Sequence, residues 1–359
     1  MRAAYGPVVR RRAWVRAVGL LLGAAADVAM GDPRRGHPVA GFGRVAAALE
    51  QRCHADRRSA GLVYTAVLVG GAAGLGVLAE RATARRPLAG VALTGLVTWA
   101  VLGGSSLAGH GARLARELAA GDLAAARARL PSLCGRDPAA LDAAGMARAG
   151  TESMAENTSD AAVAPLLWGA VAGLPGLLGY RAVNTLDAMV GYRSARHRRF
   201  GWASARLDDL ANLVPARVTA VLLAGLAPAV GGSPRAALTA WRRDAAAHPS
   251  PNAGPVEAAA AGALGVTLGG RTVYAHGVED RPCLGDGPAP APVDLGRAAR
   301  LSRLVGWAAA VLAAGLAAAT PTRSRRARGG RAHAAPGIVP RSTGMSWRRR
   351  SRTARAELA

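Results

Sequence analysis

The chain has 359 residues, of which 51% are hydrophobic and only 4% aromatic, and its formal net charge is +24. Every basic residue is arginine, and this charge favours anionic partners such as phosphates, acidic small molecules or anionic lipid. No zinc-finger pattern and no basic patch interleaved with aromatic residues occurs, so nucleic acid is not expected as a partner. The three cysteines are scattered without a C-x-x-C pair, which excludes a disulfide framework and a cysteine-based zinc site.

Two uncharged runs are each long enough to cross a bilayer, which takes about 20 apolar residues in a helix. Residues 60–79 carry no charge, and residues 88–112 contain only His110 as an ionisable group. The short link between them carries three arginines, so we expect the two helices to form a hairpin.

Four further apolar runs are candidate membrane segments: residues 17–30, 161–180, 210–232 and 304–320. The run at 161–180 contains two prolines, which favours a kinked or re-entrant helix buried in protein. We therefore expect an all-α, multipass integral membrane protein with four to six membrane segments, in which polar helical loops carry the site. Residues 1–320 form this membrane-embedded domain in our prediction, and residues 321–359, with eleven arginines and one glutamate, have the composition of a disordered tail.

The first polar loop, residues 31–39, follows the first apolar run. Its Gly and Pro residues predict a turn. Asp32 and His37 are candidates for acid–base groups or ligands. The alternative for both is structural, namely an aspartate-stabilised turn with a surface histidine.

A row of carboxylates immediately precedes residues 161–180. If this stretch is helical, Glu152, Glu156 and Asp160 lie at positions i, i+4 and i+8, on one face. Such a row of like charges is repulsive unless a cation such as Mg²⁺ or an amine neutralises it. The structural alternative is an exposed polar helix end.

The densest polar segment spans residues 179–212. Arg181, Arg193 and Arg206 suit phosphate or carboxylate, because a guanidinium group offers a two-pronged hydrogen-bond donor. Asp208 and Asp209 suit Mg²⁺, which commonly takes one or two carboxylates and then phosphate from the substrate. Charged residues that merely anchor a membrane helix are the alternative.

A fourth segment, residues 248–254, contains prolines that bias the residues before them to extended geometry. This geometry presents His248, Ser250 and Asn252 as a fixed polar edge. No Walker A loop, nucleophile elbow, H-E-x-x-H or Rossmann signature is present, so the common enzyme classes that use these motifs gain no support.

Together these motifs resemble the adenosylcobinamide-phosphate synthase family (CobD/CbiB) of cobalamin biosynthesis. The resemblance rests on G-D-P-x-x-x-H-P-V at 31–39, E-S-M-A-E-N-T-S-D at 152–160, Y-R-A-V-N-T-L-D-A-M-V-G-Y-R at 180–193, F-G-W-A-S-A-R-L-D-D-L-A-N at 200–212 and H-P-S-P-N-A-G at 248–254. It covers residues 20–315, and Ala161 departs from the Gly expected after the aspartate.

The resemblance implies a multipass enzyme of the inner (plasma) membrane. Such an enzyme joins (R)-1-amino-2-propanol, or its O-phosphate, to the free carboxylate of adenosylcobyric acid in an ATP-dependent amide ligation. Because a carboxylate is a poor acyl donor, ATP would convert it to an acyl phosphate, and this step calls for Mg²⁺ and cationic groups. ATP and Mg²⁺ are therefore the expected co-substrate and cofactor. The expected partners are the two substrates, the lipid bilayer and possible complexes with other late cobalamin enzymes.

On this hypothesis the candidate residues fall into three groups. The catalytic residues are Glu152, Glu156, His248 and His37; the substrate- and phosphate-binding residues are Arg181, Arg193, Arg206, Asn157, Asn184, Asp187 and Asn252; and the metal ligands are Asp160, Asp208 and Asp209.

Three other classes of protein compete with the ligase. A non-catalytic membrane carrier would place ionisable residues inside its spans, where only Asp27, His110 and Arg217 qualify. An AmpE-like regulatory protein on the same scaffold would not need the acidic and arginine motifs. A CDP-alcohol phosphotransferase would need further aspartates at fixed spacing downstream, and a pattern of this kind is missing after Asn212.

Overall fold

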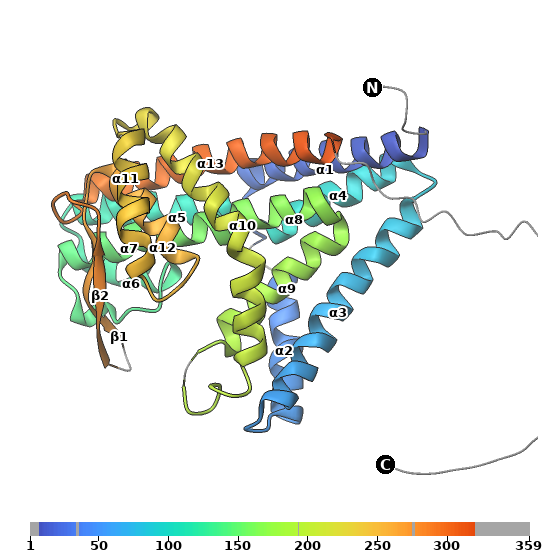
Figure 1. The fold of residues 1–359 in the computed structure, drawn as a ribbon, viewed down its shortest axis with the longest axis horizontal. Coiled ribbons are helices and arrows are strands. Elements are labelled where there is room, and N and C mark those ends of the chain that lie inside the picture. The colour runs from blue at the N-terminus through green and yellow to red at the C-terminus, as the bar shows by residue number, and fades with distance from the viewer. Residues whose placement is uncertain (1–6, 34–35, 193, 275–276, 320–359) are drawn as a thin grey trace, which may run out of the picture. The chain divides into compact units, whose positions relative to one another are not determined.

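The computed structural model describes residues 7–33, 36–192, 194–274 and 277–319. Arg193 and the predicted tail at 321–359 lie outside these residues. The described part is almost entirely helical, which confirms the expected all-α class (Figure 1).

Five stretches are long and apolar enough to cross a membrane, within the predicted range of four to six. They are Arg11–Met30, Arg58–Thr83, Pro87–Ala119, Trp202–Val230 and Pro292–Ala319. They correspond to α1 (Pro7–Met30), α3 (Arg58–Thr83), α4 with α5 (Pro87–Val101 and Gly104–Ala119), α10 (Trp202–Leu226) and α13 (Pro292–Ala319). Large apolar side chains such as Val63, Leu75 and Val214 are more than half exposed on these helices. Such an exposed apolar surface fits contact with lipid.

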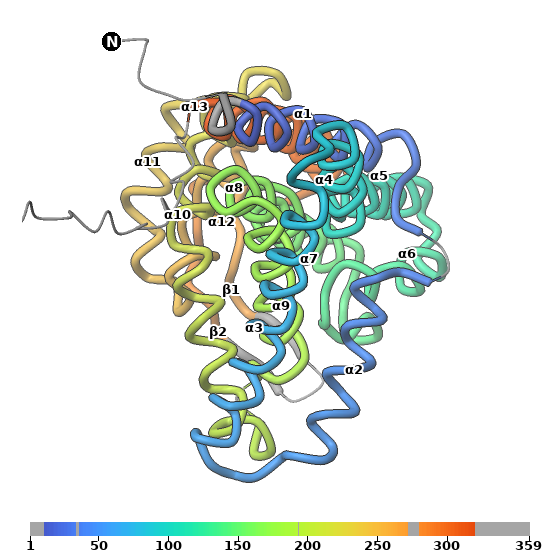
Figure 2. The backbone as a smooth tube through the Cα atoms, turned by 90° about the vertical axis from the view of Figure 1, so that its right-hand side faces the viewer, coloured from blue at the N-terminus to red at the C-terminus, as the bar shows by residue number. Residues whose placement is uncertain are grey.

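The predicted hairpin of the two helices at residues 60–79 and 88–112 is wrong. Helix α4 packs along α1, whereas α3 leaves this layer and packs against α9 (Figures 1 and 2). Gly19 and Gly23, one turn apart on α1, allow the close approach. A Cβ atom at Gly19 would lie 2.5 Å from Cβ of Thr94, and one at Gly23 would lie 2.3 Å from Cβ of Thr98. Small residues at this spacing are a common means of close helix packing in membranes.

The run at 161–180 is broken rather than continuous, and it is not among the five candidate spans. A π-helical turn at Ser159–Val163 leads into α8 (Ala164–Ala172), which ends at Gly173 with φ of 68°. Helix α9 (Leu174–Val190) then runs beside α3. The two sequence motifs before and after this break, which a continuous span would have separated, therefore line one cleft.

The remaining elements are shorter. They are α2 (Pro38–Cys53), α6 (Leu123–Arg129), α7 (Ala143–Thr158), α11 (Pro234–Asp244), α12 (Ala253–Leu264), β1 (Leu268–Tyr274), β2 (Gly277–Leu284) and five 3-10 or π turns. The antiparallel β1–β2 hairpin was not predicted. Asp142 caps α7 by accepting a hydrogen bond from the Gly145 amide at 2.7 Å, which sets where the first site helix begins.

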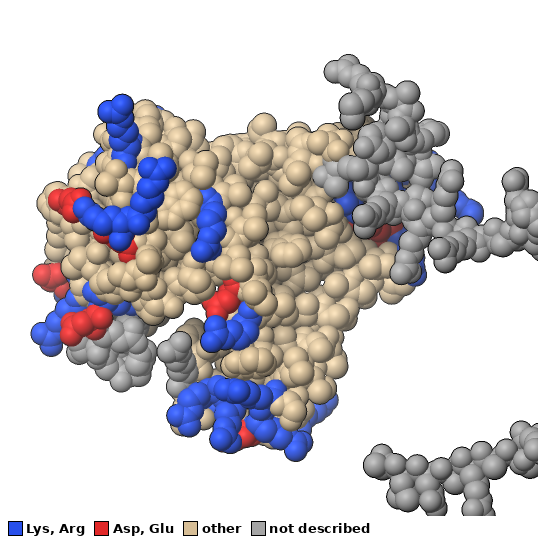
Figure 3. Space-filling model, viewed as in Figure 1, with Lys and Arg blue, Asp and Glu red and all other residues tan. Residues whose placement is uncertain are grey.

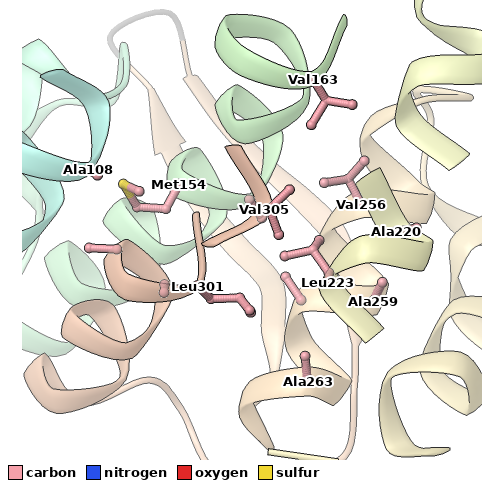
Figure 4. Close-up of a cluster of buried hydrophobic side chains, with 14 of the residues drawn as sticks. Ala108, Met154, Val163, Ala220, Leu223, Val256, Ala259, Ala263, Leu301 and Val305 are labelled. Atoms are coloured by element: carbon pink, nitrogen blue, oxygen red, sulfur yellow. The ribbon is translucent and has the colours of Figure 1, made fainter. Parts of the chain in front are cut away.

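The main core lies where α7, α10, α12 and α13 meet (Figure 4). Met154, Leu223 and Val305 fill it, and small residues such as Ala220 and Ala259 let the helices come close. A separate cluster around Tyr64 and Phe200 joins the far ends of α2, α3 and α9. Helix α9 is thus held at both ends, because Leu174 and Leu177 belong to the main core and Leu186 and Val190 belong to the second cluster.

The contact between α3 and α9 generates a stability prediction. A Cβ atom at Gly76 would lie 2.5 Å from the backbone nitrogen of Pro175, whereas Gly70 on the same helix has no atom within 4 Å of such a Cβ. We expect Gly76→Val to destabilise the protein by about 1–3 kcal/mol, as overpacking does, and the matched control Gly70→Val to have little effect. Thermal unfolding in detergent measures both, and equal transition temperatures for the two variants would contradict this packing.

Candidate active site

A cleft of about 850 Å³ opens where α7, α9, α12 and the start of α10 converge. Figure 3 shows acidic and basic side chains meeting at a hollow between the lobe with α11, α12 and the β-hairpin and the extension made by α2, α3 and the lower part of α10. The cleft is lined by six carboxylate residues, Glu152, Glu156, Asp160, Asp187, Asp209 and Glu257, and by four arginines, Arg136, Arg198, Arg206 and Arg281. Carboxylates therefore outnumber guanidinium groups in its described lining.

Both carboxylate oxygens of Glu152 accept hydrogen bonds from the protein. It is 3% exposed, and its Oε2 accepts a very short hydrogen bond from Arg136, which is also buried. Its Oε1 accepts a hydrogen bond from the Gly269 amide at 2.7 Å. Glu152 thereby ties α7 to strand β1 and to the segment before α7. Losing one partner of such a buried pair leaves an uncompensated charge, which is strongly destabilising.

Glu156, Asp160 and Asp187 form the acidic centre of the cleft. Glu156 is open to the cavity but otherwise surrounded by protein, and this burial, aided by Glu152, raises its pKa. Burial and then the neighbouring Asp208 and Glu156 raise the pKa of Asp160 well above its usual value. The pKa of Asp187 is raised to about 7, by burial and then by Asp208 and Asp209. All three pKa values are raised because several carboxylates lie close together where little water can screen their charge.

Asp208 and Asp209, in the first turns of α10, complete this centre. A small cavity of about 110 Å³ lies between them and Glu156, Asp160 and Asp187. Asp208 accepts a hydrogen bond from Asn212 at 3.0 Å through Oδ2, while its buried Oδ1 has no hydrogen-bond partner among the described residues.

The donors around this cavity are of the kind that Mg²⁺ uses. Within the described residues, no three His, Cys, Asp or Glu side chains already stand in the geometry of a metal site. Mg²⁺ nonetheless commonly needs only one or two carboxylates, with water and phosphate completing its shell. The unpaired Asp208 oxygen and the surplus of carboxylates fit such an ion.

The two described arginines of the sequence hypothesis occupy different places: Arg206 lines the cleft and Arg181 does not. Arg181 is turned away from the cleft lining, where its guanidinium donates to the carbonyl of Val101 at the end of α4 and to Asn184 at 3.3 Å. Asn184 in turn donates to Asp160 at 3.4 Å. Arg206 lines the cleft, is largely exposed, and lies 3.6 Å from Asp209.

Three other predicted residues have identifiable positions. Asn157 lines the cleft and donates to the carbonyl of Ser153 at 3.0 Å. Asn252 is buried beside the small cavity, where it donates to the carbonyl of Asp209 at 2.7 Å and so joins α12 to α10. His37 is outside the cleft lining and caps α2 by accepting from the Val39 amide at 3.2 Å. The structural alternative for this histidine therefore has direct support.

His248 lines the cleft with one ring nitrogen already engaged. The Ser250 amide, which can only donate, points its hydrogen at Nδ1 over 3.1 Å. The neutral ring therefore carries its proton on Nε2, which lies 4.0 Å from a carboxylate oxygen of Glu257. Burial, then the nearby Arg281, lowers the pKa of His248 and keeps the ring neutral.

Sequence reasoning did not assign Glu257, Arg136 or Arg281 to the site. Glu257 is 2% exposed on α12, and burial followed by the charge of Glu156 raises its pKa well above the usual value. A lone carboxylate in the apolar stretch 253–264 was the available signal, because an unpaired charge there would be costly. Arg281 comes from strand β2, whose contact with the cleft depends on the unpredicted hairpin.

Comparison with known proteins identifies the family. Residues 20–305 match the family model described as CobD/Cbib protein. The chain belongs to the CobD/CbiB family. It is 60% identical over 299 residues to the cobalamin biosynthesis protein CobD of Mycobacterium tuberculosis (strain ATCC 25618 / H37Rv), covering 83% of this chain and 95% of that protein.

Other members are more distant. The chain is 45% identical over 285 residues to the CobD of Rhodobacter capsulatus, covering 77% of this chain and 90% of that protein. It is 46% identical over 265 residues to the CobD of Geobacter metallireducens, covering 72% and 83%. Family membership gives the chain a role in cobalamin biosynthesis. No solved structure matches it.

The acidic centre generates a prediction about pH. Because the pKa of Asp187 is raised from 3.8 to about 7, the folded state binds this proton more tightly than the unfolded chain does. In buffer without divalent cations, thermal stability in detergent should therefore fall as pH rises from 3.8 to about 7. Asp187→Asn should flatten this slope, whereas Asp280→Asn, at an exposed position, should keep it. An unchanged slope in Asp187→Asn would contradict the burial of negative charge described above.

Proposed function

We propose that the chain is an ATP-dependent ligase, which forms an amide between the free carboxylate of adenosylcobyric acid and (R)-1-amino-2-propanol or its O-phosphate. The observation that carries the proposal is the convergence of carboxylates from three separate segments, residues 152–160, 187 and 208–209, on one cleft with arginines at its rim. The five membrane-length helices support a multipass membrane protein, and we place it in the inner membrane.

The acidic centre has the donors for Mg²⁺. Asp160, Asp208 and Asp209 are the proposed ligands, with Asp187 beside them. Bound there, the ion would offset the excess negative charge and neutralise the phosphate oxygens of ATP during transfer to the carboxylate. Asn184 holds Asp160 by a hydrogen bond, and Arg181 holds Asn184, so these two residues orient a ligand rather than bind phosphate directly.

In this proposal the arginines of the cleft wall bind phosphate. Arg198 and Arg206 are exposed at its rim, and Arg281 lies deeper, where its charge reaches Glu156 and Glu257. A guanidinium group can hold two phosphate oxygens at once. Either ATP or aminopropanol phosphate would use this side of the cleft.

The attacking amine arrives as an ammonium ion and must lose a proton. The neutral form of His248 donates from Nε2, so it is not a base in its resting state. Glu156 and Glu257 are better acceptors, because their raised pKa values bring their proton affinity closer to that of an amine. We assign the base to this pair, with His248 donating toward Glu257.

The assay that tests the reaction uses membranes bearing the full chain, given adenosylcobyric acid, ATP, Mg²⁺ and either amine. We expect an ATP-dependent amide product, detected as a corrinoid of higher mass, and the preferred amine identifies the second substrate. Absence of product with both amines, from correctly inserted protein, would overturn the ligase and return the carrier and regulatory functions to consideration.

The acidic centre, which holds the proposed metal ligand Asp209 and the proposed base Glu156, is tested by substitution. Glu156→Ala and Asp209→Ala should each abolish turnover without changing membrane insertion, because each removes a carboxylate from the small cavity. Asp56→Ala, at an exposed position outside the cleft, is the control. Full activity in both cleft variants would exclude the proposed acidic centre.

The base assignment is tested by comparing Glu257→Gln with His248→Gln. Removal of a general base costs about 10²–10⁴-fold in rate. We expect Glu257→Gln to lower kcat in that range with little change in the KM for ATP, and His248→Gln to cost less. A larger loss in His248→Gln, with Glu257→Gln near the parent rate, would reverse the assignment.

A further inference from the structure

A second large hollow lies away from the cleft, where the first half of α1, the end of α3, the start of α4 and the start of α9 meet. It has a volume of about 580 Å³. Its charged lining comprises five arginines, Arg11, Arg12, Arg16, Arg81 and Arg85, and one acid, Glu80. The described lining therefore has a large positive excess at one end of three membrane-length helices.

Glu80, the one acidic residue of the described lining, already has two partners. Oε1 of Glu80 lies 3.4 Å from Arg16 and accepts a hydrogen bond from the Leu174 amide at 3.1 Å. Arg16 also donates to the carbonyl of Val171 at 3.3 Å. These contacts hold the break at Gly173 and leave Glu80 unable to neutralise the other guanidinium groups.

The remaining arginines lack acidic partners within the described part of the chain. Arg11 donates to the backbone carbonyl of Arg85 at 3.0 Å, which fixes the link between α3 and α4 against α1. Arg12, Arg81 and Arg85 are exposed, and within the described residues none of their side chains forms an ion pair. Several guanidinium groups facing one hollow repel one another unless an anion lies between them.

The other wall of the hollow is apolar. Val15, Val77 and Leu174 line it, together with small residues at the start of α4. Exposed Leu78 and Leu88 continue this apolar surface beside it. The described lining contains no aromatic side chain on which a base could stack, which disfavours a nucleotide. The combination fits a ligand with an anionic head and an aliphatic tail.

We propose that this hollow binds an anionic phospholipid, with its phosphate among Arg12, Arg81 and Arg85 and an acyl chain along Val15, Val77 and the surface beyond them. Guanidinium groups suit phosphate oxygens, and the ends of membrane helices are where phospholipid headgroups lie. The lipid would link α1, α3 and α4 at the point where Glu80 holds the start of α9, the helix that carries Asp187.

The test uses the full chain, purified in detergent and depleted of lipid, and titrated with phosphatidylglycerol or phosphatidylcholine under native mass spectrometry. We expect bound phosphatidylglycerol at lower concentrations than phosphatidylcholine, and a rise in unfolding temperature with phosphatidylglycerol only. The triple variant R12Q/R81Q/R85Q should weaken phosphatidylglycerol binding by at least about tenfold, since each lost phosphate contact is a charge-assisted hydrogen bond.

The control variant R52Q/R57Q/R199Q removes the same charge from exposed arginines near the opposite end of α3 and should bind phosphatidylglycerol like the parent. If the triple variant does not fold, the single variant Arg12→Glu provides the comparison. Equal phosphatidylglycerol binding by parent and hollow variants would overturn the site. Equal stabilisation by glycerol phosphate or inorganic phosphate would overturn the lipid as occupant, because a free anion would then account for the arginines.

Discussion

The arrangement of this protein depends on keeping negative charge balanced in a place that water reaches poorly. Carboxylates on α7, α9, α10 and α12 face one cleft, and burial raises the pKa values of Glu156, Asp160 and Glu257. The fold offsets part of that charge with Arg136 and Arg281. The remaining negative charge must be met by protons, a metal ion or the substrates themselves. This excess of negative charge is the physical basis of the Mg²⁺ site that we propose.

Part of this charge, Asp208 and Asp209, lies in the first turns of α10, one of the five apolar helices long enough to cross a membrane. Their interiors are rich in Ala and Gly, so helices approach closely, as α4 does at Gly19 and Gly23 of α1. The breaks that interrupt two of the apolar runs, at residues 102–103 and at Gly173, are each tied by a charged side chain: Arg181 donates to the carbonyl of Val101, and Glu80 accepts from the Leu174 amide. Backbone groups freed at a helix break need such partners where water is scarce.

Three of the predicted site residues make structural contacts within the fold. Glu152 is the clearest example, since both of its oxygens are occupied by Arg136 and the Gly269 amide. Asn252 joins α12 to α10, and His37 caps α2. The two glutamates on one face of α7 therefore differ. Glu152 holds the β1–β2 hairpin against α7, whereas Glu156 is open to the cavity. The π turn that follows α7 then alters the helical register around Asp160.

The sequence by itself determined the helical class, a range of four to six membrane segments that contains the five observed, and most of the acidic residues of the cleft. It could do so because apolar run length and polar motifs are local properties of the chain. It also located Glu156, Asp160, Asp187 and Asp209, which line one cleft. Tertiary structure alone decided that α4 packs on α1, that the 161–180 run breaks at Gly173, and that Arg281 and Glu257 join the site. Those outcomes depend on contacts between segments far apart in the chain, such as Gly19 facing Thr94 or Arg281 of β2 reaching the cleft. Residue spacing within one segment does not predict such contacts.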